Sequence, residues 1–341
     1  MNTKMLLALS AVIVVFIMAG QVVTYWVNPY HYDADAVISD GNIIFNINAP
    51  SSEYSVVAYD NGGFEPVTEI YVFIDAGYCS GQSLSDQRTF LNQLERELSV
   101  RGSSPPTEVN ADELRTLMSE PGSGKGILML SGAFPDTVYS GNSGDPVFSW
   151  LDSMGSIYWM NGKIGRSVSH DDGTTTALED TDMLFFGMDG AVRTSDDNPI
   201  GTERGKDRAL GEMLCVNFDV ERPGDATNGL SDKIGGKTLS IGFADKDGYG
   251  SITLTDSGKG KGMIAVFGGG LTGDTRTAVA QVISSGISYD INTENIWTRT
   301  GTMNGTCSGT IGPAEEFTNV YIFLGKMTTI YGKLLTLGEE T

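Results

Sequence analysis

The chain is poor in cysteine and histidine for its length of 341 residues. Its three cysteines, Cys79, Cys215 and Cys307, are too few for a disulfide scaffold and have no metal-ligand spacing. Of its two histidines, His31 lies among aromatic residues directly after a long apolar run, which leaves His170 as the one candidate general base. The sequence therefore argues against a zinc module or a disulfide-rich module.

Basic residues are also scarce. The 22 Lys and Arg residues stand against 43 Asp and Glu, and the formal net charge is −21. Proteins that bind nucleic acid need a basic face to meet the phosphates, so nucleic acid is excluded as a partner. A strongly acidic surface instead favours solubility on a cell surface or in salty surroundings.

Charge is absent from the apolar segment between Met5 and Val27. At about 1.5 Å per residue, a helix of this length reaches roughly 34 Å, enough to cross a hydrocarbon core of about 30 Å. Lys4 precedes the segment, and the next basic residue is Arg88, so the positive-inside rule places Met1 in the cytoplasm. We predict a single-pass protein of the cell membrane with its C-terminal portion outside the cytoplasm.

A cleavable signal peptide is the alternative for this segment. Ala19 and Gly20 supply a small-residue cleavage site after an apolar stretch. The apolar character continues to Val27, which favours the anchor.

The remaining pattern divides the chain into further parts. Residues 1–4 form a cytoplasmic stub, 5–27 the transmembrane anchor, 28–66 a β-rich stalk, 67–290 an α/β domain with insertions at about 165–236, and 291–341 a C-terminal β extension. In the α/β part, short apolar strands such as 69–75 alternate with amphipathic helices such as 85–100. This order predicts an α/β fold with a mostly parallel sheet flanked by helices.

Three segments of the α/β part carry a family resemblance. They are GILMLSGAFP from Gly126 to Pro135, GSIYWMNG from Gly155 to Gly162, and GMIAVFGGG from Gly262 to Gly270. In this order they resemble the oxyanion turn, the nucleophile elbow and the last strand of class I glutamine amidotransferase-like domains, which have a flavodoxin-like fold.

The resemblance implies a degenerate, non-catalytic member. Active members carry Gly-x-Cys-x-Gly at the elbow, where this chain has Asn161, and a Phe-His-Pro-Glu stretch where this chain has glycines after Phe267. The turns would then meet in a pseudo-active site that binds a ligand, glycan or protein partner at the cell surface. The ligand-binding residues predicted there are Ser131, Gly132, Asn161, Gly162, Gly268, Gly269 and Gly270.

A thiol hydrolase or amidase is the alternative function. The segment Gly77 to Gly81, GYCSG, has the Gly-x-Cys-x-Gly form and follows a strand. A triad of Cys79, His170 and Asp172 would let the imidazole generate the thiolate while the carboxylate orients the ring. Against this, the family does not place its elbow after the first strand.

The remaining signals concern metals, glycans and assembly. No cofactor is predicted, although Asp171 and Asp172 leave Ca²⁺ open. Asn304 begins the sequon Asn-Gly-Thr in a polar segment and is a candidate glycosylation site. A third class of function is a surface filament or coat subunit assembled through the N-terminal helix.

Overall fold

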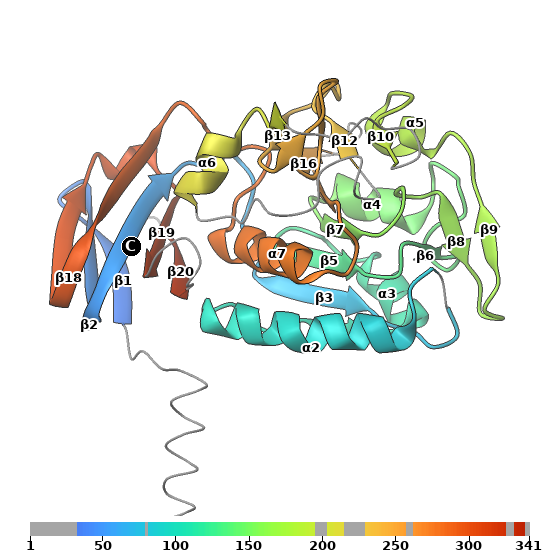
Figure 1. Cartoon of the computed structure of the whole chain (residues 1–341), viewed down its shortest axis with the longest axis horizontal. Helices are drawn as coiled ribbons and strands as arrows, with labels where there is room; N and C mark the ends of the chain where they lie inside the picture. The colour runs from blue at the N-terminus through green and yellow to red at the C-terminus, as the bar shows by residue number, and fades with distance from the viewer. Residues whose placement is uncertain are drawn as a thin grey trace, which may run out of the picture.

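A computed structural model of the chain describes residues 33–78, 81–194, 203–214, 229–256, 262–324 and 331–337. Figure 1 shows a curled sheet, made of the first and last strands, at one end of the molecule. A larger sheet covered by helices fills the other end. The two sheets are joined side by side through one shared apolar core.

The larger sheet has seven strands in the order β13-β16-β17-β7-β5-β3-β4. Their bounds are β3 Glu69–Phe73, β4 Thr107–Val109, β5 Lys125–Met129, β7 Ser156–Met160, β13 Thr238–Ser240, β16 Ile252–Asp256 and β17 Met263–Phe267. The strands from β17 to β4 are parallel to one another, whereas β16 and β13 run antiparallel beside β17. Strands β7 and β17 are buried at every position, which explains their continuous apolar sequences.

Helices cover both faces of this sheet. Helices α2 (Leu84–Val100) and α7 (Gly273–Ser285) lie side by side and share one core cluster (Figure 1). Helices α3 (Ala111–Leu117) and α4 (Pro146–Asp152) contribute to the cluster on the other face. The apolar positions of α2 recur at helical spacing as Phe90, Leu91, Leu94 and Leu98, and all four are buried.

The second sheet joins the two ends of the described chain. It contains β1 (Asp33–Ser39), β2 (Asn42–Tyr59), β18 (Ile296–Ile311), β19 (Asn319–Leu324) and β20 (Tyr331–Thr336). β2 is its central strand and pairs antiparallel with β1, β18 and β19. The residues predicted as an N-terminal stalk and a C-terminal extension thus pair with one another.

The sheet is bent, because β2 and β18 turn together where their register breaks between Met303 and Gly305. The bend brings the ring of Phe45, in the first half of β2, to 6.3 Å from the ring of Trp297 at the start of β18. The two layers so formed enclose their own apolar cluster. The curled sheet therefore resembles a small, flattened barrel.

Polar contacts fix the curled sheet against α7. The hydroxyl of Tyr59 donates to the carbonyl of Ser285, and Asn61 Nδ2 donates to the carbonyl of Gly286 at 3.0 Å. Asn61 Oδ1 in turn accepts from Ser288 Oγ at 2.8 Å. These groups are buried, so each hydrogen bond replaces one that water would otherwise make.

Short elements complete the fold. A three-stranded sheet holds β6 (Phe134–Pro135), β8 (Ser167–Ser169) and β9 (Thr175–Ala177); a five-stranded one holds β10 (Val192–Arg193), β11 (Glu203–Arg204), β12 (Gly229–Ser231), β14 (Phe243–Ala244) and β15 (Tyr249–Gly250). The remaining helices are α5 (Thr181–Phe186), α6 (Arg208–Met213) and the 3₁₀ turn η2 (Ala314–Glu316).

The predicted fold class was wrong for the molecule as a whole. Eleven of the sixteen strand pairings among the described residues are antiparallel and five are parallel. The alternation of strands and helices after residue 67 favours a parallel sheet, and the β-rich ends lie outside this alternation. Those ends form a complete sheet, so the protein is a β-rich molecule with mostly antiparallel sheets.

The predicted membrane anchor also requires correction. The segment 5–27 itself lies outside the residues that the structure describes. In the described part, no helix is both long enough and apolar enough to span a membrane. This finding contradicts the single-pass topology and the membrane localisation predicted from the sequence.

Candidate functional site

The carboxyl ends of the parallel strands bring three predicted turns together. In the sheet register, Met129 of β5 pairs with Trp159, and Met160 of β7 pairs with Phe267 of β17. The residues that follow these strands therefore emerge at the same edge of the sheet. In open parallel sheets, this edge is where ligands usually bind.

Asn161 lies at the centre of this edge. It directly follows β7, is 8% exposed, and has φ of 65°, in the left-handed region that asparagine tolerates better than most residues. Its Nδ2 donates to the carbonyl of Leu130 at 2.8 Å, and its Oδ1 accepts from Gln82 Nε2 at 3.3 Å. The side chain thus ties the end of β5 to the segment that leads into α2.

Glycines allow the neighbouring turns to approach Asn161. A Cβ on Gly132 would lie 2.7 Å from the backbone oxygen of Asn161, and one on Gly270 would lie 2.8 Å from its Oδ1. Both glycines have positive φ, of 75° and 64°. Gly162 has φ of 72°, and its carbonyl accepts from Trp159 Nε1 at 2.8 Å. The three turns are therefore packed against one another.

Two other predicted residues have local structural contacts. Ser131 Oγ donates to the carbonyl of Ala133 at 2.8 Å within its own turn. Gly268 donates its N–H to the carbonyl of Ser251 at 2.7 Å, and its carbonyl accepts from Thr275 Oγ1 at 3.0 Å. These contacts stabilise the turns on which Asn161, Gly269 and Gly270 depend.

A cavity of about 390 Å³ opens beside Asn161, between the starts of α2 and α7. We call it the α2–α7 cleft. Its lining is Gln82, Asp86, Thr89, Phe90, Gln93, Asn161, Gly269, Gly270, Leu271, Thr272 and Arg276. Sequence reasoning found the glycines and Asn161 but missed the contribution of α2, whose polar positions look like an ordinary solvated face.

The charged groups of the cleft are few and held in place. Arg276 Nε lies 2.6 Å from Glu97 Oε1, and its Nη1 donates to Gln93 Oε1. Asp86, in the first turn of α2, accepts at 2.6 Å from the hydroxyl of Ser83, the N-cap of the helix. One carboxylate and one guanidinium therefore face three carboxamides and two hydroxyls. The lining is close to neutral and offers both hydrogen-bond donors and acceptors.

The proposed hydrolase triad is only partly described. Cys79 lies outside the described residues. His170 Nδ1 lies 2.7 Å from Asp136 Oδ2, and its Nε2 lies 2.8 Å from Thr176 Oγ1. Asp172 instead accepts from Thr174, whose hydrogen bonds lower the pKa of that carboxyl. The carboxylate beside the imidazole is thus Asp136, which sequence reasoning missed because it lies in another loop.

Tyr78 connects the Cys79 loop to this pair. Burial first, and then the charges of Asp136 and Asp171, raise the pKa of its phenol. His170, Asp136 and Tyr78 therefore form a small polar cluster around one carboxylate. None of these three residues is among those that line the α2–α7 cleft.

The predicted calcium ligands do not assemble into a metal site in the described part of the chain. There, no group of three or more His, Cys, Asp or Glu side chains is arranged to hold a metal ion. Asp171 and Asp172 lie in the turn between β8 and β9, and both are exposed. Because both side chains are exposed, water solvates their charges.

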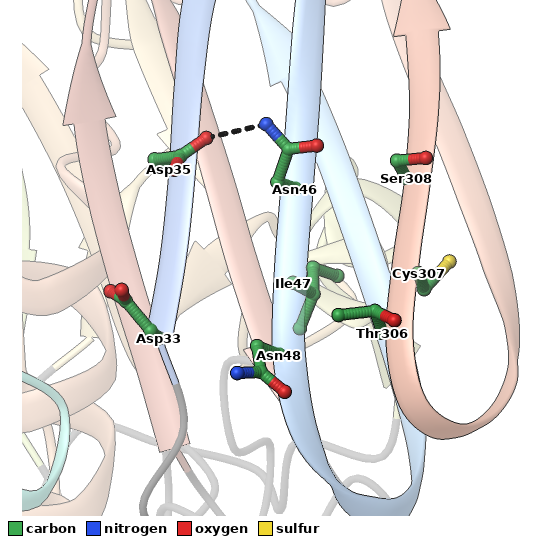
Figure 2. A pocket seen from close by; sticks show the side chains of 8 residues that line it. All are labelled: Asp33, Asp35, Asn46, Ile47, Asn48, Thr306, Cys307 and Ser308. Carbon is green, nitrogen blue, oxygen red and sulfur yellow. Dashed lines mark hydrogen bonds between the residues drawn. The ribbon is translucent and has the colours of Figure 1, made fainter.

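A second hollow, of about 230 Å³, lies on the curled sheet. Its lining side chains come from β1, β2 and β18 (Figure 2). Asp35 Oδ1 accepts a hydrogen bond from Asn46 Nδ2 at 2.8 Å. Cys307 is half-buried there, and its hydrogen bond to the phenol of Tyr54 is the main cause of the raised pKa of that tyrosine. Asn304, the predicted glycosylation site, lies exposed at the break in the register of β18.

No known protein family matches the chain, and no curated protein sequence matches it. The amidotransferase-like resemblance therefore stays a prediction from the sequence.

Proposed function

We propose that the protein binds a small, uncharged, polyhydroxylated ligand of sugar size in the α2–α7 cleft, without transforming it. The observation that carries the proposal is the lining of the cleft. Gln82, Gln93 and Asn161 place three carboxamides around a space of about 390 Å³ at the carboxyl edge of the parallel strands. Cavities of this size suit small molecules.

The chemistry of the lining supports a neutral ligand. Carboxamides and hydroxyls both donate and accept hydrogen bonds, as the hydroxyl groups of a sugar require. Among the described residues that line the cleft, Arg276 alone carries a guanidinium, and Glu97 and Gln93 already engage it. The carboxylate of Asp86 opposes an anion. The net charge of −21 adds long-range repulsion of anions.

The residue at the elbow position supports binding over catalysis. Asn161 occupies the left-handed turn after β7, where the resemblance implies that an enzyme would hold its cysteine. A carboxamide is not a nucleophile, and the hydrogen bonds of this one to Leu130 and Gln82 fix its orientation. Its role in the proposal is to orient ligand hydroxyls together with Gln82.

The test is calorimetric titration of the full-length chain with neutral mono- and disaccharides, with inorganic phosphate as the anionic comparison. We expect saturable binding of at least one sugar and none of phosphate. Thr89→Val should weaken that binding, because Thr89 lines the cleft and the substitution removes a polar group from it.

Thr116→Val on α3 is the matched control. Thr116 and Thr89 are both exposed helical threonines whose hydroxyls donate to the carbonyl four residues earlier, at 3.0 and 2.8 Å. An equal effect of the two substitutions would place the ligand elsewhere. Binding of phosphate instead of sugars would refute the neutral ligand class.

A thiol hydrolase is the second candidate, and one observation favours it. His170 Nδ1 lies 2.7 Å from Asp136 Oδ2, and the charge of this carboxylate also contributes, after burial, to the raised pKa of Tyr78, the residue before Cys79. In this version Asp136 takes the orienting role that was predicted for Asp172. Ester hydrolysis that disappears in Cys79→Ser and Asp136→Asn but persists in Asp172→Asn would support the hydrolase. Turnover that is unaffected by Cys79→Ser would exclude it.

A further inference from the structure

Strand β18 forms an edge of the curled sheet. Among the described residues it pairs with β2 alone, and in Figure 1 it lies at the margin of the molecule. An edge strand presents a row of backbone N–H and C=O groups that can pair with another strand. Sheet edges that do not associate are usually protected by charge, proline or a bulge.

The bend divides this edge into two arms. The register breaks between Met303 and Gly305, and the second arm, from Gly305 to Ile311, continues in regular pairing with Ile43–Ala49 of β2. We call residues 305–311 the β18 arm. Together with β1 and the first half of β2, it makes a three-stranded layer whose outer strand is the arm.

The β18 arm has little of the usual protection. It contains no charged residue and no proline, although Asp and Glu alone supply 43 of the 341 residues in the chain. Its exposed positions are Thr306, Ser308 and Thr310. Figure 2 shows Thr306 and Ser308 beside Asn48 and Asn46 of β2, on one face of the layer. The bulge is confined to the start of the arm.

We propose that the β18 arm pairs antiparallel with the same arm of a second copy of this chain, and so joins two curled sheets into one continuous sheet across a twofold axis. The net charge of the chain indicates which surface two copies can bring together. Two copies that each carry a formal charge of −21 repel one another, and contact through a neutral strip adds least to this repulsion. The arm is such a strip, and the two exposed aspartates of the layer lie on its far strand, β1.

The sequence of the arm is also self-complementary. With Ser308 opposite its copy, Thr306 faces Thr310 on the outer face, and hydroxyl pairs of this kind favour cross-strand contact. On the inner face, Cys307 then lies opposite Gly309, and Ile311 opposite Gly305. The space beside Gly305 is open, whereas the space beside Gly309 holds the ring of Phe45 and the guanidinium of Arg299, which must shift to admit Cys307 of the second copy.

The proposal predicts a salt-dependent dimer. Raising the ionic strength from about 0.01 M to about 0.15 M shortens the Debye length from roughly 30 Å to roughly 8 Å, which screens the repulsion between copies. Sedimentation equilibrium of the full-length chain should show dimerisation that tightens over this range. A chain that remains monomeric at every salt concentration would overturn the proposal.

Ser308→Lys tests the location of the interface. At the twofold axis it places two like charges directly opposite one another, which should weaken dimerisation roughly tenfold. Asn46→Lys is the control, because Asn46 is exposed in the same row of the sheet, one strand inside the edge. It adds the same charge without meeting its copy. The control should dimerise as the parent does or more tightly.

Cys307 provides a second readout that does not depend on the lysine variants. In a Cys79→Ser, Cys215→Ser background, a short bismaleimide should join Cys307 to its copy, since the two lie diagonally across the proposed strand pair. A dimer that forms without this cross-link and resists Ser308→Lys would use another surface, and the proposed interface would be wrong.

Discussion

Three turns pack so closely around Asn161 that one added carbon atom in a neighbouring turn would clash with it. Gly132 is the tightest of these positions, because an added Cβ would meet a backbone oxygen, which cannot rotate away. Its φ of 75° is in addition unfavourable for any residue with a Cβ. Two separate penalties therefore apply at one position.

We predict that Gly132→Ala lowers the free energy of unfolding by about 2 to 5 kcal/mol, from conformational strain and the forced shift of Asn161. Gly173→Ala is the control, since Gly173 has φ of 79° but no atom within 4 Å of the added Cβ. It should lose only about 1 to 2 kcal/mol. Urea denaturation measures both, and equal losses would contradict the close contact.

Tyr139 offers a test at high pH. It is 1% exposed, and its hydroxyl has no hydrogen-bond partner among the described residues. Burial first, and then the charge of Asp145, raise the pKa of the phenol from 10.0 to about 12. Below pH 10 both the folded and the unfolded chain keep this proton. Between pH 10 and 12 only the unfolded chain loses it, so stability falls as the pH rises.

Tyr139→Phe should therefore reduce the loss of stability between pH 10 and 12. It should also leave stability at neutral pH unchanged or raise it by about 1 kcal/mol, because it removes an unsatisfied buried group. Urea melts at pH 8 and pH 11 measure both effects. A large destabilisation at pH 8 would show that the hydroxyl has a partner.

Residues that follow a strand could be predicted from the sequence, whereas residues brought together by folding could not. Asn161 and the glycines after β17 stand at the ends of apolar runs, so their common edge followed from strand direction. Asp136 is separated from His170 along the chain, and their 2.7 Å contact depends on how β6 pairs with β8. No local pattern specifies that pairing.

At the scale of elements, α3 is short enough to depend on its cap. Asn110 Oδ1 accepts from the N–H groups of Asp112 and Glu113 at 3.0 Å, and Glu113 Oε2 accepts from the N–H of Asn110 at 2.9 Å. This reciprocal capping box satisfies N–H groups that the first helical turn would leave unpaired.

Asn110→Ala should lower the free energy of unfolding by about 1 kcal/mol. Glu113→Gln should have a smaller effect, because glutamine also completes a capping box. Thermal denaturation of the two variants measures the difference. Indistinguishable melting temperatures would mean that packing of Leu114 and Leu117 alone holds the helix.

Element positions were easier to predict than element partners. Apolar runs located β3, β5, β7 and β17, since buried strands need continuous apolar sequence. The segment 28–66, predicted to be β-rich, contains β1 and β2. The pairing of β2 with β18 joins segments more than two hundred residues apart, and the threonine-rich sequence of β18 resembles a polar loop. For this reason the fold class was misjudged although many strands were found.

At the scale of the whole molecule, the net charge of −21 opposes compaction. We predict that the melting temperature of the full-length chain rises as sodium chloride increases from about 0.01 M to about 1 M, because screening weakens this repulsion. Potassium chloride should give the same rise if screening is the cause. A melting temperature that stays flat or falls would show that specific ion pairs matter more than the overall charge.

The pairing of β2 with β18 has a consequence for synthesis. β2 ends at Tyr59, and its longest partner begins at Ile296. At about 5 to 20 residues per second, roughly 12 to 50 seconds separate the two on the ribosome. During that interval the central strand of the curled sheet has only β1 beside it. All strands of the larger sheet lie between Asp60 and Asn292, so this sheet can fold before β18 is made. A backbone hydrogen bond from Asn292 to Asp60 then joins the two ends of this segment. The emerging chain must therefore keep one edge of β2 unpaired until about its last seventh has been made.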